Sequence, residues 1–144
     1  MKVLIASDHA GLQLKASLLE ALADAKVDHQ DLGPSAPDSV DYPDFAQKVA
    51  RAVAGQNDAL GVLVCGSGIG MSIAANKVKG VRAALCRTEL EAKLARQHND
   101  ANVLCLGERI TGQSLARAIL EAFLSARFEG GRHQRRVDKM EPAP

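Results

Sequence analysis

A cysteine followed by alternating glycines is the segment of this sequence best suited to chemistry. Cys65 ends an apolar run and is followed by Gly66-Ser67-Gly68-Ile69-Gly70. Glycines allow backbone N–H groups to point toward one centre, where they bind an anion such as a phosphate or a developing oxyanion. A thiol beside such amides is suited to removing a proton next to a carbonyl, with the amides stabilising the enediolate that forms. The segment therefore predicts an acid–base site.

Three familiar anion-binding loops each require a residue that this segment lacks. A Walker A loop ends in Gly-Lys-Ser/Thr, whereas Gly70-Met71-Ser72 has no lysine. A dinucleotide fingerprint has G-x-G-x-x-G after the first strand, whereas the spacing here is G-x-G-x-G after the third. A cysteine-phosphatase loop has an arginine six residues after the nucleophile, a position that Met71 occupies here. The proton-transfer interpretation of the loop therefore remains.

The other two cysteines, Cys86 and Cys105, lie in apolar runs without such a loop. We assign both to core packing, which is also the alternative role for Cys65. The chain has three cysteines, an odd number, and no C-x-x-C pair. This pattern predicts reduced thiols in a cytoplasmic protein.

Polar residues also follow the first and last apolar runs. Asp8 and His9 follow the first run after Ser7, and Arg109 comes after the last. In an open parallel sheet, ligands bind beyond the carboxyl ends of the strands, where the strand order reverses. If the first and third strands are neighbours, Asp8, His9 and Cys65 converge on one crevice.

Two further clusters carry charge and hydrogen-bonding groups. The segment Arg96-Gln97-His98-Asn99-Asp100 is, taken alone, most simply a solvated helix end. The basic segment near the carboxyl end is, taken alone, a solvated tail. Arg132 and Arg136 are four residues apart, however, so on a helix they share one face and offer two guanidinium groups to one phosphate.

The elements that must position these residues alternate along the chain between strands and helices. Short apolar runs rich in Val, Leu and Ile predict strands of a buried parallel sheet, and a more polar run predicts an edge strand. The apolar runs are Val3–Ala6, Leu60–Cys65, Val81–Cys86 and Val103–Leu106, and the polar run is Val27–Leu32. Apolar residues at helical spacing predict helices between them. The stripes are Leu14, Leu18, Leu22 and Ala25; Phe45, Val49, Ala52 and Val53; and Leu115, Ile119, Leu120, Phe123 and Leu124.

This alternation predicts one domain over residues 1–144, with a three-layer α/β/α Rossmann-like fold around a five-stranded parallel sheet. A helix over Met71–Val78 is expected after the glycine loop. Thr88 begins Thr-Glu-Leu-Glu, a capping-box pattern, and predicts the start of another helix. Thr111 is the predicted N-cap of the next one.

Charge and composition exclude several classes of function. The formal net charge is +1 and only 3% of residues are aromatic, so the chain offers neither a field nor stacking surfaces for nucleic acid. No apolar stretch approaches the roughly 20 residues that a membrane helix needs. The amino terminus turns polar too early for a signal peptide. We therefore expect a cytoplasmic protein without nucleic-acid or membrane partners.

Six segments together resemble ribose-5-phosphate isomerase type B, of the ribose/galactose isomerase family. The resemblance runs from the first strand to about Val137. The segments are Ser7-Asp8-His9-Ala10-Gly11, Asp41-Tyr42-Pro43, the run from Cys65 to Lys77, Gly80-Val81-Arg82-Ala83, the run from Arg96 to Val103, and Glu129-Gly130-Gly131-Arg132-His133.

The resemblance implies interconversion of ribose 5-phosphate and ribulose 5-phosphate, without a metal or another cofactor. It makes Cys65 the base that moves a proton between C2 and C1, and His98 the acid that opens the furanose ring. Asp8 assists ring opening, and Ser67 places a hydroxyl near the sugar oxygens. Relatives of a second branch use a glutamate after the glycine loop as base. Met71 occupies that position here, so the chain resembles the cysteine branch.

The resemblance also implies how the substrate is bound and how the protein assembles. Asn99 binds the sugar, and amides from Gly66, Ser67, Gly68, Ile69 and Gly70 stabilise the enediolate. The implied phosphate ligands are His9, Arg109, Arg132 and Arg136. A homodimer or a tetramer shares its active sites between subunits, and the basic C-terminal helical extension, residues 129–144, packs on a partner subunit. The last residues, Glu141-Pro142-Ala143-Pro144, are expected to fray.

Two other functions remain open at this point. One is a non-catalytic sensor of phosphorylated metabolites that uses the same crevice. The other is isomerisation of another phosphosugar, such as allose 6-phosphate or a tetrose phosphate. Whether Asp8 acts on the sugar directly or only orients His98 is also open.

Overall fold

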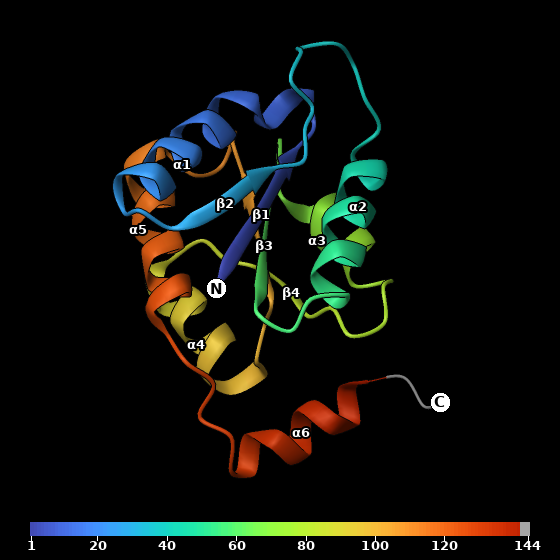
Figure 1. The fold of residues 1–144 in the computed structure, drawn as a ribbon, viewed down its shortest axis with the longest axis vertical. Helices are drawn as coiled ribbons and strands as arrows, with labels where there is room; N and C mark the ends of the chain where they lie inside the picture. The colour runs from blue at the N-terminus through green and yellow to red at the C-terminus, as the bar shows by residue number, and fades with distance from the viewer. Residues whose placement is uncertain (142–144) are drawn as a thin grey trace.

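Five parallel strands form the centre of the fold, which the computed structural model describes over residues 1–141 (Figure 1). The strands are β1 (Lys2–Ser7), β2 (Asp28–Asp31), β3 (Ala59–Cys65), β4 (Ala83–Leu85) and β5 (Val103–Gly107). Their order across the sheet is β2-β1-β3-β5-β4. The predicted five-stranded parallel sheet is therefore confirmed. Its first and third strands are neighbours, so the strand order reverses between them.

Helices cover both faces of this sheet. They are the short 3₁₀ helix η1 (His9–Gly11) and the α-helices α1 (Leu12–Asp24), α2 (Tyr42–Ala54), α3 (Ile69–Ala75), α4 (Glu89–Asn99), α5 (Gln113–Ser125) and α6 (Arg132–Met140). Helices α1, α4 and α5 pack on one face, and α2 and α3 pack on the other (Figure 1). The predicted apolar stripes face the sheet, with two exceptions. Ala25 is the exposed C-cap of α1, and Leu115 lies on the exposed rim of α5.

The fourth strand is shorter than the apolar run Val81–Cys86 predicts. The N–H of Arg82 donates to the side chain of Asn102 at 2.8 Å, and only the carbonyl of Arg82 pairs with the neighbouring strand, where it accepts from the N–H of Val103 at 3.3 Å. Asn76 then bonds both backbone groups of Ala83, accepting from its N–H at 2.8 Å and donating to its carbonyl at 2.9 Å. Side chains distant in sequence thus set where β4 begins.

The helix starts agree only in part with their sequence signals. Helix α3 begins and ends earlier than the predicted Met71–Val78, since the glycine loop itself enters the helix. The capping box at Thr88 is confirmed, because its hydroxyl accepts from the N–H of Glu91 at 3.1 Å while the Glu91 carboxylate accepts from the N–H of Thr88. The prediction for Thr111 is wrong. Gly112 is the N-cap of α5, and Thr111 is buried in the preceding turn.

The two ends of the sheet carry different elements. The loops that follow β1 and β3 lie at one end, whereas α4 ends and α6 crosses at the opposite end (Figure 1). Glu141, the first residue of the segment predicted to fray, accepts a hydrogen bond from Arg82 at 2.5 Å. The rest of that segment, residues 142–144, lies outside the described residues. Within residues 1–141, none of the helices combines the length and the apolar character needed to cross a membrane.

Candidate active site

A cavity of about 560 Å³ opens where β1 and β3 end. It is the crevice predicted at the reversal of strand order, and Asp8, His9 and Cys65 meet there as expected. The predicted site residues that line it are Asp8, His9, Cys65, Gly66, Ser67, Ile69, Gly70 and Arg109. Ala10, Tyr42, Ile73 and Ile110 complete the lining.

Cys65 supplies the thiol of this cavity from the last position of β3. Its side chain is only 5% exposed, and its Sγ accepts a hydrogen bond from the N–H of Gly68 at 3.1 Å. Gly68 has a φ of +77°, a left-handed conformation that favours glycine. The loop therefore turns an amide toward the sulfur, an arrangement that stabilises negative charge on the thiol.

Cys86 and Cys105 are buried in the two layers of the core, as predicted. Burial, with a smaller contribution from Glu91, raises the pKa of Cys86 to about 12. Burial also raises the pKa of Cys105. Both groups therefore remain neutral thiols near neutral pH and are poorly suited to proton transfer.

Arg109 reaches the cavity from the end of β5, the strand next to β3. The N–H of Glu108 donates to the carbonyl of Cys65 at 2.9 Å, and the N–H of Arg109 donates to the carbonyl of Gly66 at 3.0 Å. The guanidinium group lies over Gly66, since a Cβ at that glycine would be 3.2 Å from Nη1 of Arg109. Backbone pairing thus places a cation beside the glycine loop.

Asp8 and His9 are held by the turn that follows β1. The N–H of Asp8 donates to the carbonyl of Val64 at 3.1 Å, and Oδ1 of Asp8 caps η1 by accepting from the N–H of Ala10 at 2.9 Å. Nδ1 of His9 accepts from the N–H of Val40 at 3.2 Å. In the neutral ring the proton is therefore on Nε2, which makes that nitrogen a donor.

Gly107 gives the first testable consequence of this packing. A Cβ at that position would lie 2.5 Å from the backbone carbonyl carbon of Ser67. We expect Gly107→Ala to push the glycine loop outward and to lower the free energy of unfolding by about 1–3 kcal/mol, measured by urea denaturation. Gly112→Ala is the matched control, because a Cβ there meets no atom within 4 Å. Equal stability of the two variants would contradict the close contact.

Tyr42 is a lining residue to which sequence reasoning assigned no role. Its ring packs on Gly70, where a Cβ would lie 2.6 Å from two ring carbons. The only signal in the sequence was the segment Asp41-Tyr42-Pro43 in the family resemblance. That segment begins α2, which carries the ring to the wall of the cavity.

Apart from Gly68, whose N–H bonds Cys65, the remaining predicted site residues lie elsewhere in the chain. His98 and Asn99 end α4, and Arg132 and Arg136 lie one turn apart on α6, as predicted for a shared helix face. The end of α4 and helix α6 lie at the end of the sheet opposite the glycine loop (Figure 1). Within one copy, the structure does not bring these four residues to the Cys65 cavity.

His98 belongs instead to a cluster with Glu129 and His133. The two imidazole rings stack with centroids 4.3 Å apart and an interplanar angle of 8°. Nε2 of His98 lies 3.9 Å from Oε2 of Glu129, and Nε2 of His133 lies 3.6 Å from the same oxygen. Burial lowers the pKa of His133, and the nearby His98 and Arg132 lower it further. Sequence reasoning gave Glu129 and His133 no role, although their i, i+4 spacing was a signal.

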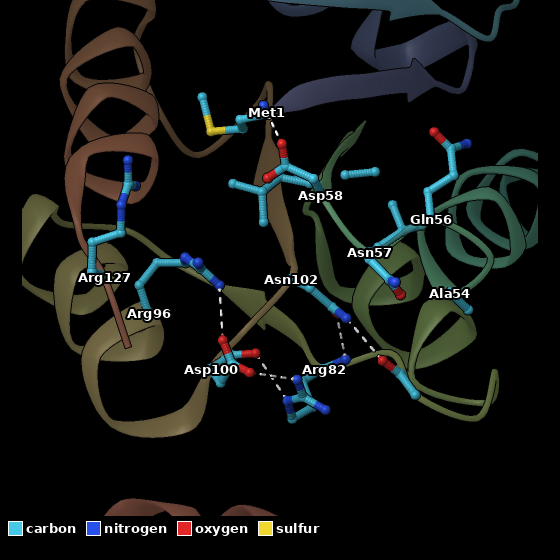
Figure 2. Close-up of a pocket in the computed structure, with 14 residues that line it drawn as sticks. Met1, Ala54, Gln56, Asn57, Asp58, Arg82, Arg96, Asp100, Asn102 and Arg127 are labelled. Atoms are coloured by element: carbon cyan, nitrogen blue, oxygen red, sulfur yellow. Dashed lines mark hydrogen bonds and ion pairs between the residues drawn. The ribbon is translucent and has the colours of Figure 1, made fainter. Parts of the chain in front are cut away.

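The end of α4 that carries His98 is tightly held. Arg82 donates from Nε to the carbonyl of Asn99 at 3.1 Å and from Nη2 to the carboxylate of Asp100 at 3.0 Å. Arg96 donates to the other carboxylate oxygen of Asp100 at 3.3 Å. Arg82, Arg96 and Asp100 line a separate cavity of about 510 Å³. Figure 2 shows Asp100 between the two guanidinium groups. The network fixes the backbone directly after His98.

Fold and site together define a Rossmann-like α/β domain with a buried thiol in a glycine-rich loop at the carboxyl end of its sheet. The chain belongs to the ribose/galactose isomerase family, whose model matches residues 3–140. It is 46% identical over 137 residues to ribose-5-phosphate isomerase B of Escherichia coli. The matched region covers 95% of this chain and 92% of that protein.

Solved structures agree with this assignment. The ribose-5-phosphate isomerase B of Clostridium thermocellum is 49% identical, with a TM-score of 0.94 over 97% of this chain and 95% of that chain. The ribose-5-phosphate isomerase B of Mycoplasma genitalium, solved with bound ribulose-5-phosphate, is 52% identical, with a TM-score of 0.93 over 96% of this chain and 93% of that chain.

Proposed function

We propose that this protein is a ribose-5-phosphate isomerase, an intramolecular oxidoreductase that interconverts D-ribose 5-phosphate and D-ribulose 5-phosphate in the non-oxidative branch of the pentose phosphate pathway. The observation that carries the proposal is the Cys65 thiol in one cavity with His9 and Arg109, in a chain whose full-length relatives bear the name of this activity. The thiol supplies a base, and the two cationic or donor side chains suit a phosphate. We place the reaction in the cytoplasm, where thiols stay reduced.

The proposed reaction passes through a cis-enediolate. The Cys65 thiolate takes the proton from C2 of the open-chain aldose, the C2–H electron pair forms the C1–C2 double bond, and the carbonyl oxygen on C1 becomes an oxyanion. Backbone N–H groups of Gly66–Gly70 stabilise that oxyanion. Cys65 then delivers the proton to C1, while the hydroxyl proton on O2 passes to O1 and C2 becomes the ketone. Ser67 contributes a hydroxyl beside the sugar oxygens.

Ring opening precedes proton transfer, because cyclic ribose 5-phosphate has no free carbonyl. His98 donates a proton to the ring oxygen as the bond from C1 to that oxygen breaks. Asp8 assists by accepting the proton that the C1 hydroxyl releases as it becomes the carbonyl, and Asn99 binds the sugar. Both His98 and Asn99 sit at the end of α4 that Arg82 and Asp100 hold in place. The phosphate is bound by His9, Arg109, Arg132 and Arg136 through charge-assisted hydrogen bonds.

This assignment requires two copies of the chain, since one copy holds the two groups of residues at opposite ends of its sheet. The rim of the Cys65 cavity supports such a contact. Ile69, Ile73 and Ile110 are 48%, 56% and 58% exposed there, although apolar side chains of this size are usually covered when they cluster. We therefore propose a homodimer, or a dimer of dimers, in which the α4–α6 end of one copy closes the cavity of the other. The basic extension from residue 129 onward then packs on the partner.

Substrate choice tests the proposed activity. We expect kcat/KM for ribose 5-phosphate to exceed the values for allose 6-phosphate and erythrose 4-phosphate by at least about tenfold, because a change of one carbon moves the phosphate relative to Cys65. A coupled or polarimetric assay of all three sugars measures the ratio. A higher kcat/KM for allose 6-phosphate or erythrose 4-phosphate would show that the preferred sugar, and not ribose 5-phosphate, is the substrate. Ligand-induced thermal stabilisation without turnover would instead identify a sensor.

A further inference from the structure

The cluster of His98, Glu129 and His133 contains three side chains that commonly bind transition metals. One ligand atom from each residue lies within 4.8 Å of the others. In a tetrahedral zinc site, bonds of 2.0–2.2 Å place neighbouring ligand atoms about 3.4 Å apart. The two contacts to Oε2 of Glu129, at 3.9 and 3.6 Å, therefore need to shorten by only about 0.5 Å or less. The distance between the two imidazole nitrogens must shorten by somewhat more than this.

The environment of the three side chains allows this approach. The side chain of His133 is 9% exposed and is held by its surroundings, whereas those of His98 and Glu129 are 37% and 49% exposed and can rotate. The stacked rings bring both Nε2 atoms within 4 Å of the same carboxylate oxygen. One fixed ligand and two adjustable ligands on one side of it are sufficient to enclose a small cation.

The backbone also holds the three residues together before any ligand binds. The N–H of Glu129 donates to the carbonyl of Gln97 at 3.0 Å, which ties the chain after α5 to the residue preceding His98. The N–H of His133 donates to the carbonyl of Gly130 at 3.0 Å. Because the ligands are already assembled, binding costs little chain ordering.

We propose that His98, Glu129 and His133 form a binding site for one divalent transition-metal ion, with Zn²⁺ as the best-matched ion, and that the bound ion inhibits the enzyme. Two imidazoles and a carboxylate are a typical three-residue zinc set that leaves a fourth position for water or another oxygen ligand. The ion occupies Nε2 of His98, so that nitrogen can no longer donate a proton. The inhibitory part, unlike the binding part, rests on the proposed function of His98.

Calorimetric titration of the full-length protein with zinc chloride tests the binding. We expect one Zn²⁺ per chain in the wild type and at least about tenfold weaker binding in Glu129→Gln and His133→Ala. Glu129→Gln is the decisive variant, because the half-exposed side chain is not needed for folding. His29→Ala, which removes a histidine outside the cluster, and Cys65→Ser, which removes the cavity thiol, should bind as the wild type does. Unchanged affinity in Glu129→Gln, or lost affinity in Cys65→Ser, would overturn the site.

The two directions of the reaction separate inhibition at His98 from poisoning of Cys65. Ribulose 5-phosphate cannot close a furanose ring because its O5 carries the phosphate, so removal of its C1 proton needs no ring opening. We expect saturating Zn²⁺ to lower turnover of ribose 5-phosphate by at least about tenfold, while exchange of the C1 proton of ribulose 5-phosphate with deuterated water continues. If Zn²⁺ abolishes both the turnover of ribose 5-phosphate and the proton exchange of ribulose 5-phosphate, inhibition through His98 is refuted. If the protein has no isomerase activity at all, the calorimetric result still decides the metal site.

Discussion

Cys65→Ala is expected to lower kcat on ribose 5-phosphate by about 10²–10⁴-fold, the range typical for loss of a positioned acid–base group. The substitution removes the sulfur atom from the wall of the cavity, together with the hydrogen bond that it accepts from the N–H of Gly68. The backbone hydrogen bonds from Glu108 and Arg109 that hold the start of the loop remain. Exchange of the C2 proton with deuterated water, followed by NMR, measures the chemical step directly. Calorimetry should show that the phosphosugar still binds.

Cys86→Ala is the control for this variant. It also removes a thiol that is almost completely buried, but the sulfur lies in the core and has a pKa raised to about 12. It should lower stability through the small cavity that it creates and leave proton exchange unchanged. Exchange that persists in Cys65→Ala would show that the base is a different group. Exchange lost in both variants would show that the effect comes from damage to the fold.

Mixing two inactive variants is expected to restore activity if the site is shared between copies. Cys65→Ala lacks the base on one side of the site, and His98→Ala lacks the acid on the other. A mixed dimer then has one site with both defects and one intact site. At equal amounts, random re-pairing makes half of the dimers mixed, so recovery should approach about a quarter of the wild-type activity. Steady-state assays after unfolding and joint refolding measure the recovery.

A second mixture provides the matched control. Asp8 and Cys65 line the same cavity of one copy, so a mixed dimer of Asp8→Ala and Cys65→Ala has one defect in each site. That mixture should stay inactive. Recovery in both mixtures would contradict the proposed division of residues, and no recovery in the first mixture would mean that each copy works with its own His98.

The sheet and the glycine loop could be predicted because their signals are local. Buried parallel strands require apolar residues on both faces, which makes runs such as Leu60–Cys65 visible in the sequence. The capping box at Thr88 is equally local, since both of its hydrogen bonds join residues three positions apart. The position of Asp8 beside Cys65 followed once the first and third strands were taken as neighbours, which the strand pairing confirms.

Features that depend on distant side chains could not be predicted in this way. Asn76 sets the start of β4 through Ala83, and neither residue carries a signal of that pairing. Tyr42 reaches the cavity only because α2 packs beside the loop. The cluster around His98 joins segments about thirty residues apart. Its Glu129 and His133 lie on either side of the glycine pair Gly130-Gly131, a turn that no periodicity describes.

Arg82 joins the segments that carry the proposed acid and the proposed phosphate-binding arginines. Its Nε holds the carbonyl of Asn99 at the end of α4, and its Nη1 holds the carboxylate of Glu141 beyond the end of α6. A change at position 82 therefore disturbs both segments together. Natural selection on ring opening or on phosphate binding would therefore act on the same residue. We expect positions 82 and 141 to vary as a pair between species.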